Sequence, residues 1–156
     1  MLITALTWLL LTAVPQYKTA PIDLENVPCR VRDCLTGLGP GYQITKRLNP
    51  FYVQGDFDGN GAADYAVSIT ELKSHKEGFV VCFSASPLKS EVLAAGRALP
   101  VEEGALVDDF AMIDIWGTAT RCGSRKRDCL YLEKSEAGGG FLIWNGDRFV
   151  WNQQGI

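Results

Sequence analysis

The nine residues 56–64 read Asp-Phe-Asp-Gly-Asn-Gly-Ala-Ala-Asp, and they indicate more about the fold than any other stretch of this 156-residue chain. Oxygen-bearing side chains occupy the first, third, fifth and ninth positions, as Asp56, Asp58, Asn60 and Asp64. Calcium takes about six to eight oxygen ligands, and a tight loop can turn alternate residues inward to supply them. The spacing therefore predicts a calcium site, to which Ala62 adds a backbone carbonyl oxygen.

The residues that flank this loop predict two strands, whereas an EF-hand has two helices. The twelfth position counted from Asp56 is Val67, where an EF-hand carries a bidentate glutamate. Residues 51–54 are rich in β-prone side chains, and residues 65–69 show the alternation of a strand. Gly61 allows the chain to bend sharply without a Cβ clash. The sequence thus predicts a hairpin closed by a calcium loop.

Residues 55–67, which read Gly-Asp-Phe-Asp-Gly-Asn-Gly-Ala-Ala-Asp-Tyr-Ala-Val, resemble the calcium loops of FG-GAP or VCBS repeats. Such repeats occur in integrin-like propellers and in many secreted bacterial proteins. The resemblance implies a structural Ca²⁺ ion, held by the four side chains and the carbonyl named above. A metal-free turn is the alternative, because Asp-Gly and Asn-Gly are strong hairpin-turn signals. Three carboxylates in nine residues argue against an empty turn, since they repel one another without a cation.

The remaining sequence predicts a mainly β (α+β) fold. We expect one antiparallel β-sheet domain over residues 17–156, built of propeller-blade-like hairpins, with one N-terminal helix packed on it. Apolar side chains recur at helical spacing over residues 26–38, where Asn26 can cap the helix and Gly39 follows its end. The chain is too short for a full propeller. Alternation and turn residues predict strands over residues 42–46, 51–54, 64–70, 78–84, 91–95, 110–118, 129–134, 141–144 and 148–152.

The N-terminal segment predicts export. Residues 1–14 are almost entirely apolar, and polar residues follow from Gln16, so residues 1–16 read as a signal peptide. The first cation is Lys18, which leaves the α-amino group as the positive end, and a buried N-terminal strand is the alternative interpretation. No apolar run reaches the length of a membrane-spanning helix. The predicted location is therefore secreted or periplasmic, with no stable membrane span.

Five cysteines fit an oxidising compartment. Cys122 and Cys129 bracket a polar excursion between two predicted strands, so they are expected to form a disulfide at the neck of a hairpin loop. Cys29 and Cys34 would lie about 8 Å apart on a helix, beyond disulfide reach. Cys82 is the alternative partner for one of them, and the sequence leaves this pairing open. The cysteine spacings are not those of zinc fingers, and the unpaired thiol is expected in the core.

The sequence offers little support for catalysis. The single histidine, His75, lies in a polar run, and no nucleophile elbow, zinc-protease pair or phosphate-binding loop occurs. Asp108, Asp109 and Asp114 are the acidic residues from which a glycan-acting hydrolase would draw its pair of carboxylates. We keep this hydrolase as the alternative function.

The first hypothesis is a non-enzymatic, exported, calcium-stabilised β module that binds another macromolecule. A net charge of −3 gives no basic field that would attract nucleic acid. The partner is expected to be a protein or a cell-envelope macromolecule, as for the small periplasmic inhibitors and immunity proteins against cell-wall hydrolases that such a loop protein resembles. The partner-binding candidates form a basic tip: Arg121, Arg125, Lys126 and Arg127.

Overall fold

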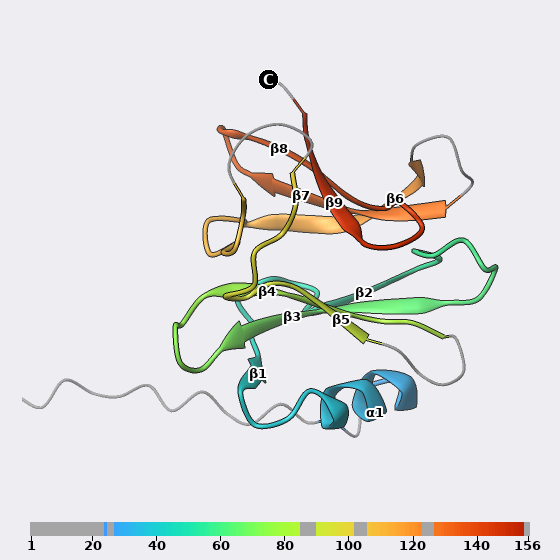
Figure 1. The fold of residues 1–156 in the computed structure, drawn as a ribbon, viewed down its shortest axis with the longest axis vertical. Helices are drawn as coiled ribbons and strands as arrows, with labels where there is room; N and C mark the ends of the chain where they lie inside the picture. Colours follow the sequence, from blue (N-terminus) through green and yellow to red (C-terminus); the bar gives the residue numbers. More distant parts are fainter. Residues whose placement is uncertain (1–23, 25–26, 85–89, 102–105, 123–126, 155–156) are drawn as a thin grey trace, which may run out of the picture.

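The protein is built of three layers: a helix, a five-stranded sheet and a four-stranded sheet (Figure 1). The computed structural model describes residues 24, 27–84, 90–101, 106–122 and 127–154. The elements are α1 (Cys29–Gly37), β1 (Tyr42–Ile44), β2 (Tyr52–Gly55), β3 (Asp64–Glu71), β4 (Glu77–Cys82), β5 (Ser90–Ala94), β6 (Ile115–Cys122), β7 (Arg127–Lys134), β8 (Gly138–Trp144) and β9 (Phe149–Gln154).

The first sheet is centred on β3 and β4, and all its strand pairs are antiparallel. β1 and β2 both pair with β3, one at each end, with Ile44 opposite Ile69 and Gly55 opposite Asp64. β5 follows β4 at the other side of the sheet. The second sheet is a simple meander in the order β6-β7-β8-β9. This antiparallel architecture confirms the predicted mainly β fold.

The first sheet is apolar on both faces because its two central strands, β3 and β4, place buried apolar side chains on each face. Successive side chains of a strand point to opposite faces. Phe79 and Val81 therefore face the second sheet, where they join one buried cluster. Val80 and Cys82 face α1 and join another. Burying a large apolar side chain contributes about 1.5–3 kcal/mol, so both faces stabilise the fold.

The helix α1 covers the outer face of the first sheet, as predicted (Figure 1). Val31 of α1 is fully buried, and the Cys34–Cys82 disulfide links the helix to β4. Pro28 precedes the first helical residue and makes no side-chain capping hydrogen bond. Asn26, the predicted cap, lies outside the described residues. Proline is well tolerated at the start of a helix because the first N–H groups have no intrahelical partner.

All nine predicted strands are present, with ends that shift by a few residues. The largest difference is β6, which begins at Ile115 and not at Phe110. The Asp109 carboxylate accepts a hydrogen bond from the Ala111 N–H at 2.9 Å, which holds this stretch in a turn. The two sheets lie face to face, and propeller-like blades are not seen in the described part of the chain (Figure 1).

No helix among the described residues is both long enough and apolar enough to cross a membrane. The predicted signal peptide, residues 1–16, lies outside the described residues.

Candidate metal centre

The acidic loop joins β2 to β3, as the flanking sequence predicts. Gly55 and Asp64 face each other as the last residue pair of this hairpin. Between them the chain turns back through Gly59 and Gly61, whose φ angles are +78° and +84°. Residues that carry a Cβ atom rarely adopt such φ angles, so glycine is favoured at both positions of the turn. The loop is thereby tight enough to direct several carboxylates to one point.

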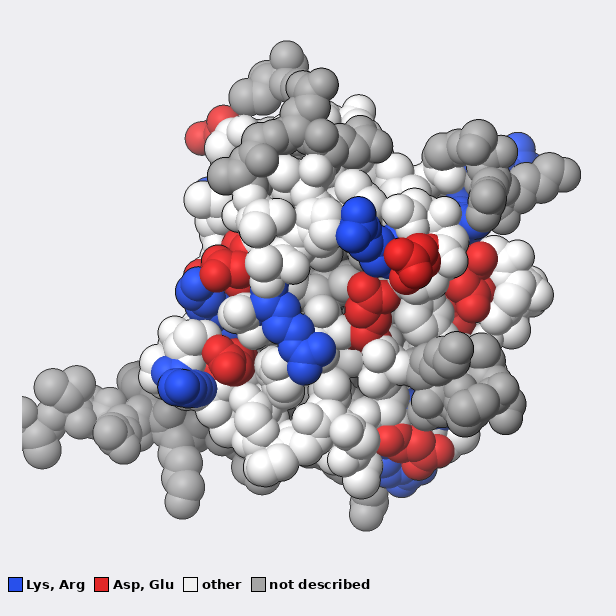
Figure 2. All heavy atoms as spheres, in the orientation of Figure 1, with Lys and Arg blue, Asp and Glu red and all other residues white. Residues whose placement is uncertain are grey.

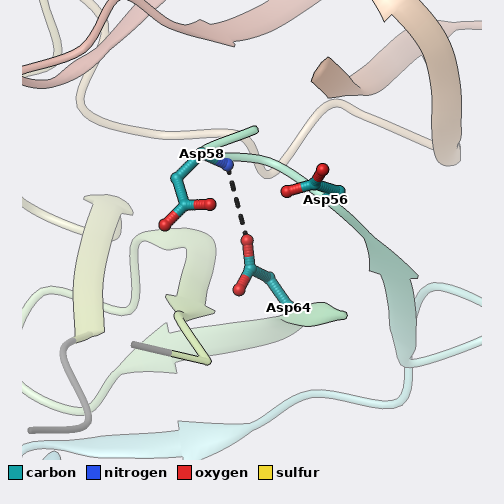
Figure 3. Close-up of side chains that lie close together, drawn as sticks. All are labelled: Asp56, Asp58 and Asp64. Carbon is teal, nitrogen blue, oxygen red and sulfur yellow. Dashed lines mark hydrogen bonds between the residues drawn. The ribbon is translucent and has the colours of Figure 1, made fainter. Parts of the chain in front are cut away.

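Three carboxylates converge inside the loop (Figure 3). Asp56, Asp58 and Asp64 each contribute one oxygen, and these oxygens all lie within 4.8 Å of one another. Two oxygens on opposite sides of a calcium ion lie at most about 5.2 Å apart, because each Ca–O distance is about 2.3–2.6 Å. The three oxygens are therefore close enough together to approach one calcium ion.

Backbone N–H groups hold these side chains in place. Asp56 Oδ2 accepts a hydrogen bond from Gly61 N–H at 3.0 Å, and Asp58 Oδ1 accepts one from Asn60 N–H at 3.0 Å. Asp64 Oδ2 accepts from Phe57 N–H at 3.0 Å and from Asp58 N–H at 3.4 Å. Figure 3 shows the last of these bonds across the loop. Positioned carboxylates need less ordering when a cation binds, which favours affinity.

Asp64 is the most unusual member of the group because it is fully buried. Burial raises the pKa of its carboxyl, and the negative charge of Asp58 raises it further. A hydrogen bond at 2.7 Å from Ser84 N–H to Asp64 Oδ1 opposes this rise. A buried carboxylate close to like charges is unfavourable unless a cation compensates it.

One oxygen of the centre has no hydrogen-bond partner. Asp56 Oδ1 is buried and unpaired among the described residues, although the other Asp56 oxygen is satisfied. Buried acceptors are normally hydrogen-bonded, so an orphaned one indicates a missing partner. A calcium ion supplies such a partner. The residues present therefore fit the ion that the sequence predicts.

The other two predicted ligands are placed differently. Asn60 uses its Oδ1 to accept a hydrogen bond from Ala62 N–H at 2.7 Å, and its Nδ2 donates to Asp58 Oδ2 at 2.9 Å. The amide group thus supports Asp58. The three convergent carboxylates are among the five predicted ligands. The Asn60 side chain and the Ala62 carbonyl stay predictions as ligands.

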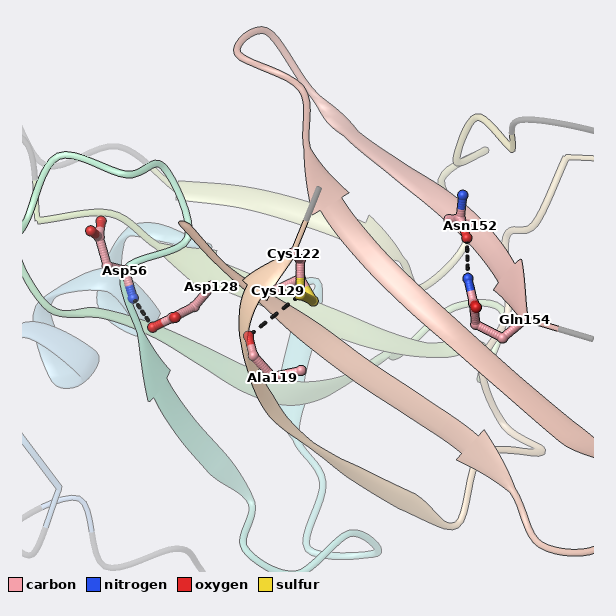
Figure 4. The surroundings of a disulfide bond; sticks show 7 residues. All are labelled: Asp56, Ala119, Cys122, Asp128, Cys129, Asn152 and Gln154. Atoms are coloured by element: carbon pink, nitrogen blue, oxygen red, sulfur yellow. Dashed lines mark hydrogen bonds between the residues drawn. A yellow bond between two sulfur atoms is a disulfide. The ribbon is translucent and has the colours of Figure 1, made fainter. Parts of the chain in front are cut away.

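Two residues that are distant in the chain support the centre, and no sequence pattern pointed to them. Asp128, at the start of β7, accepts a hydrogen bond from Asp56 N–H at 2.9 Å, and its own N–H donates to the Asp56 carbonyl at 2.9 Å (Figure 4). Ser84 lies just after β4 and donates to Asp64. Both contacts join residues far apart in the chain, so no local pattern reveals them. Through Asp128 the loop is attached to the second sheet.

Both disulfides lie on elements next to this region. Cys122 and Cys129 are bonded, as predicted, with their Cα atoms 5.9 Å apart (Figure 4). Cys34 is bonded to Cys82, which settles the pairing that the sequence left open. Cys29 is the free cysteine and is exposed, so the expectation of a buried thiol was wrong. Two disulfides fit an oxidising, extracellular type of environment.

The predicted basic tip is only partly a surface feature. Arg121 is exposed, whereas Arg125 and Lys126 lie outside the described residues. Arg127 is 5% exposed, and its Nη1 donates a hydrogen bond to the Trp144 carbonyl. The expectation that Arg127 belongs to an exposed tip was therefore wrong. Its guanidinium packs inside the fold because a buried backbone carbonyl offers it an acceptor.

The three acidic residues of the hydrolase alternative make structural contacts. Asp108 forms an ion pair with Lys76, and Asp109 accepts hydrogen bonds from the N–H groups of Glu77 and Ala111. Asp114 accepts hydrogen bonds from Lys134 and Ser135, which lower its pKa to about 2. A general acid for glycoside hydrolysis needs a raised pKa, so the environment of Asp114 is opposite to that requirement.

Comparison of the chain with known proteins found no relative. No family model matches the chain, and no match was found among curated proteins or solved structures.

Proposed function

We propose that the protein is an exported, calcium-stabilised β module that binds another macromolecule and performs no catalysis. The partner is a protein or a cell-envelope macromolecule, and an inhibitor or immunity type of role is the form of this proposal that the loop resemblance favours. One observation carries the proposal: carboxylate oxygens of Asp56, Asp58 and Asp64 lie within 4.8 Å of one another on a loop that two sheets hold in place.

Calcium has a structural role in this proposal. The ion would neutralise charges that otherwise repel one another, and it would satisfy the buried Asp56 Oδ1. Because Asp128 joins the loop to β7, a stabilised loop also stabilises the contact between the two sheets. The two disulfides support the exported location, as does the predicted leader over residues 1–16.

Calcium binding is tested by isothermal titration calorimetry on protein stripped with EGTA. We expect one site with a Kd of about 10⁻⁴–10⁻³ M, the range of extracellular calcium modules. Asp58→Asn should weaken binding about a hundredfold. At about 2.4 Å, even with the dielectric constant of water, the attraction between Ca²⁺ and a carboxylate is about 3 kcal/mol. Asp33→Asn is the matched control, because Asp33 is exposed on α1. Unchanged binding by the Asp58 variant would remove the calcium part of the proposal.

The partner is sought with the immobilised protein and an envelope extract of the source organism, in calcium and in EGTA. We expect one macromolecule to be retained in calcium and to bind the protein again after purification. If purified envelope fractions contain no component that binds with a defined stoichiometry, the binding role is wrong. Release of reducing sugar from envelope glycans, lost in Asp109→Asn, would instead support the hydrolase.

A further inference from the structure

A cleft of about 700 Å³ opens beside the acidic loop, at the end of the molecule where the two sheets meet. One wall is the β2–β3 loop with Asp58, and another is the start of β5 with Glu91. The β8–β9 turn contributes Asp147, and Arg127 of β7 lies among the lining residues. Its volume is in the range of about 300–1,000 Å³ that is typical of ligand sites.

The charges of the described residues that line the cleft do not balance. Among the described lining residues, three carboxylates, those of Asp58, Glu91 and Asp147, stand against the guanidinium of Arg127. That guanidinium is buried and donates a hydrogen bond to the Trp144 carbonyl. On the right of the molecular face shown in Figure 2, acidic side chains lie beside basic ones. Calcium on the loop would engage Asp58 and still leave two carboxylates against one cation.

Glu91 is a half-buried carboxylate among the residues that line the cleft. Its side chain is half-buried on β5, and burial raises the pKa of its carboxyl, with a further rise from the charge of Asp147. A hydrogen bond from the backbone of Phe149 offsets part of this effect. A positively charged guest would relieve the repulsion between the two carboxylates, whereas a neutral guest would not.

Aromatic side chains complete the cleft. Trp144 and Phe83 both line it, with ring centroids 5.2 Å apart and planes tilted by 59°. An ammonium or guanidinium group is attracted to the face of an aromatic ring, most strongly to that of tryptophan. Carboxylates and a tryptophan that line one cleft are a combination that suits a cationic side chain.

We propose that this cleft is the partner-binding site and that it receives an arginine or lysine side chain of a partner protein. The inference rests on the proposed binding function and specifies its surface and its ligand chemistry. The cation lies against Trp144 and pairs with Glu91 and Asp147. The excess of negative charge favours this guest over a sugar, whose hydroxyl groups would leave the carboxylates uncompensated.

The test titrates the purified protein, in calcium, with a tetra-arginine peptide and with a tetra-citrulline peptide of the same shape and no charge. Binding is followed by NMR on the indole N–H of Trp144, identified by its loss in Trp144→Phe. We expect the tetra-arginine peptide to shift this resonance and the tetra-citrulline peptide to leave it in place. Equal responses to the two peptides would overturn the proposal, as would a shift caused only by a neutral chitin tetrasaccharide.

Three variants locate the effect. Glu91→Gln keeps an oxygen for the Phe149 backbone hydrogen bond, and Asp147→Asn lies in an exposed turn, so neither change should unfold the protein. Each should weaken tetra-arginine binding about fivefold, while Asp33→Asn should leave it unchanged. Equal weakening by all three variants would mean attraction to net charge alone and would refute the site. A natural partner that binds both cleft variants normally would refute the cleft and leave the proposed function intact.

Discussion

Asp58→Asn should change the stability of the protein in opposite directions with and without calcium. In EGTA the substitution removes a charge that lies within 4.8 Å of two other carboxylate oxygens. Each pair of unit charges at that distance repels by about 1–3.5 kcal/mol, for dielectric constants from about 80 to about 20. Asp58 is half-exposed, so the low end applies, and the bond from Asn60 Nδ2 is lost. The net gain is about 1 kcal/mol.

With calcium at about 100 times its Kd, the ion stabilises the wild-type protein by about 2.7 kcal/mol. A hundredfold weaker site retains about 0.4 kcal/mol of this stabilisation. The variant should therefore be about 1.3 kcal/mol less stable than wild type in calcium. At about 3 °C per kcal/mol, its Tm should lie about 3 °C above wild type in EGTA and about 4 °C below it in calcium.

Scanning calorimetry in about 1 mM EGTA and in about 10 mM CaCl₂ measures both differences. The control Asp33→Asn should follow wild type in both buffers. A loss of stability that is the same in both buffers would refute the reasoning, because it would show that Asp58 stabilises the loop by hydrogen bonds alone. An equal gain in both would exclude calcium binding at this loop.

Three further outcomes follow from the structure. Asp64→Asn should lower the free energy of unfolding by about 1–3 kcal/mol even in EGTA, because both Asp64 oxygens accept N–H donors and an amide nitrogen cannot; urea denaturation in EGTA checks this. Replacing Cys34 and Cys82 together with alanine should cost about 4 kcal/mol, given a sequence separation of 48 residues, which a lower urea midpoint would show. The pKa of Asp114 is lowered to about 2 by Lys134, so its stabilising contribution is complete above the ordinary pKa of 3.8 and is lost as the pH falls from about 4 to about 2. Asp114→Asn should flatten that part of the curve of Tm against pH.

The strands could be predicted because their signal is local. In β4 the run of β-prone apolar residues from Phe79 to Cys82 is itself the local signal, because a strand buried on both faces carries apolar side chains at successive positions. Turn residues mark where each strand ends. The loop between β2 and β3 was predictable for the same reason, since its spacing of acidic residues and glycines lies within one short segment.

The supporting contacts were not predictable because they join distant segments. Arg127 looks like part of a solvated basic run, and only the fold shows the Trp144 carbonyl that receives its guanidinium. Asp128 is 72 residues from Asp56, and no local pattern connects the two. The hydrogen bond from the Ala62 N–H to Asn60 Oδ1 is set by the backbone geometry of the loop, which residue type does not show.

Both faces of the sheet formed by β1 to β5 carry buried apolar side chains. The helix shields one surface and the meander shields the other. If a protease cut the chain between β5 and β6 and the two fragments separated, the apolar inner face of each sheet would be exposed to water. Such large exposed apolar faces promote aggregation, so each half of the chain needs the other to remain soluble.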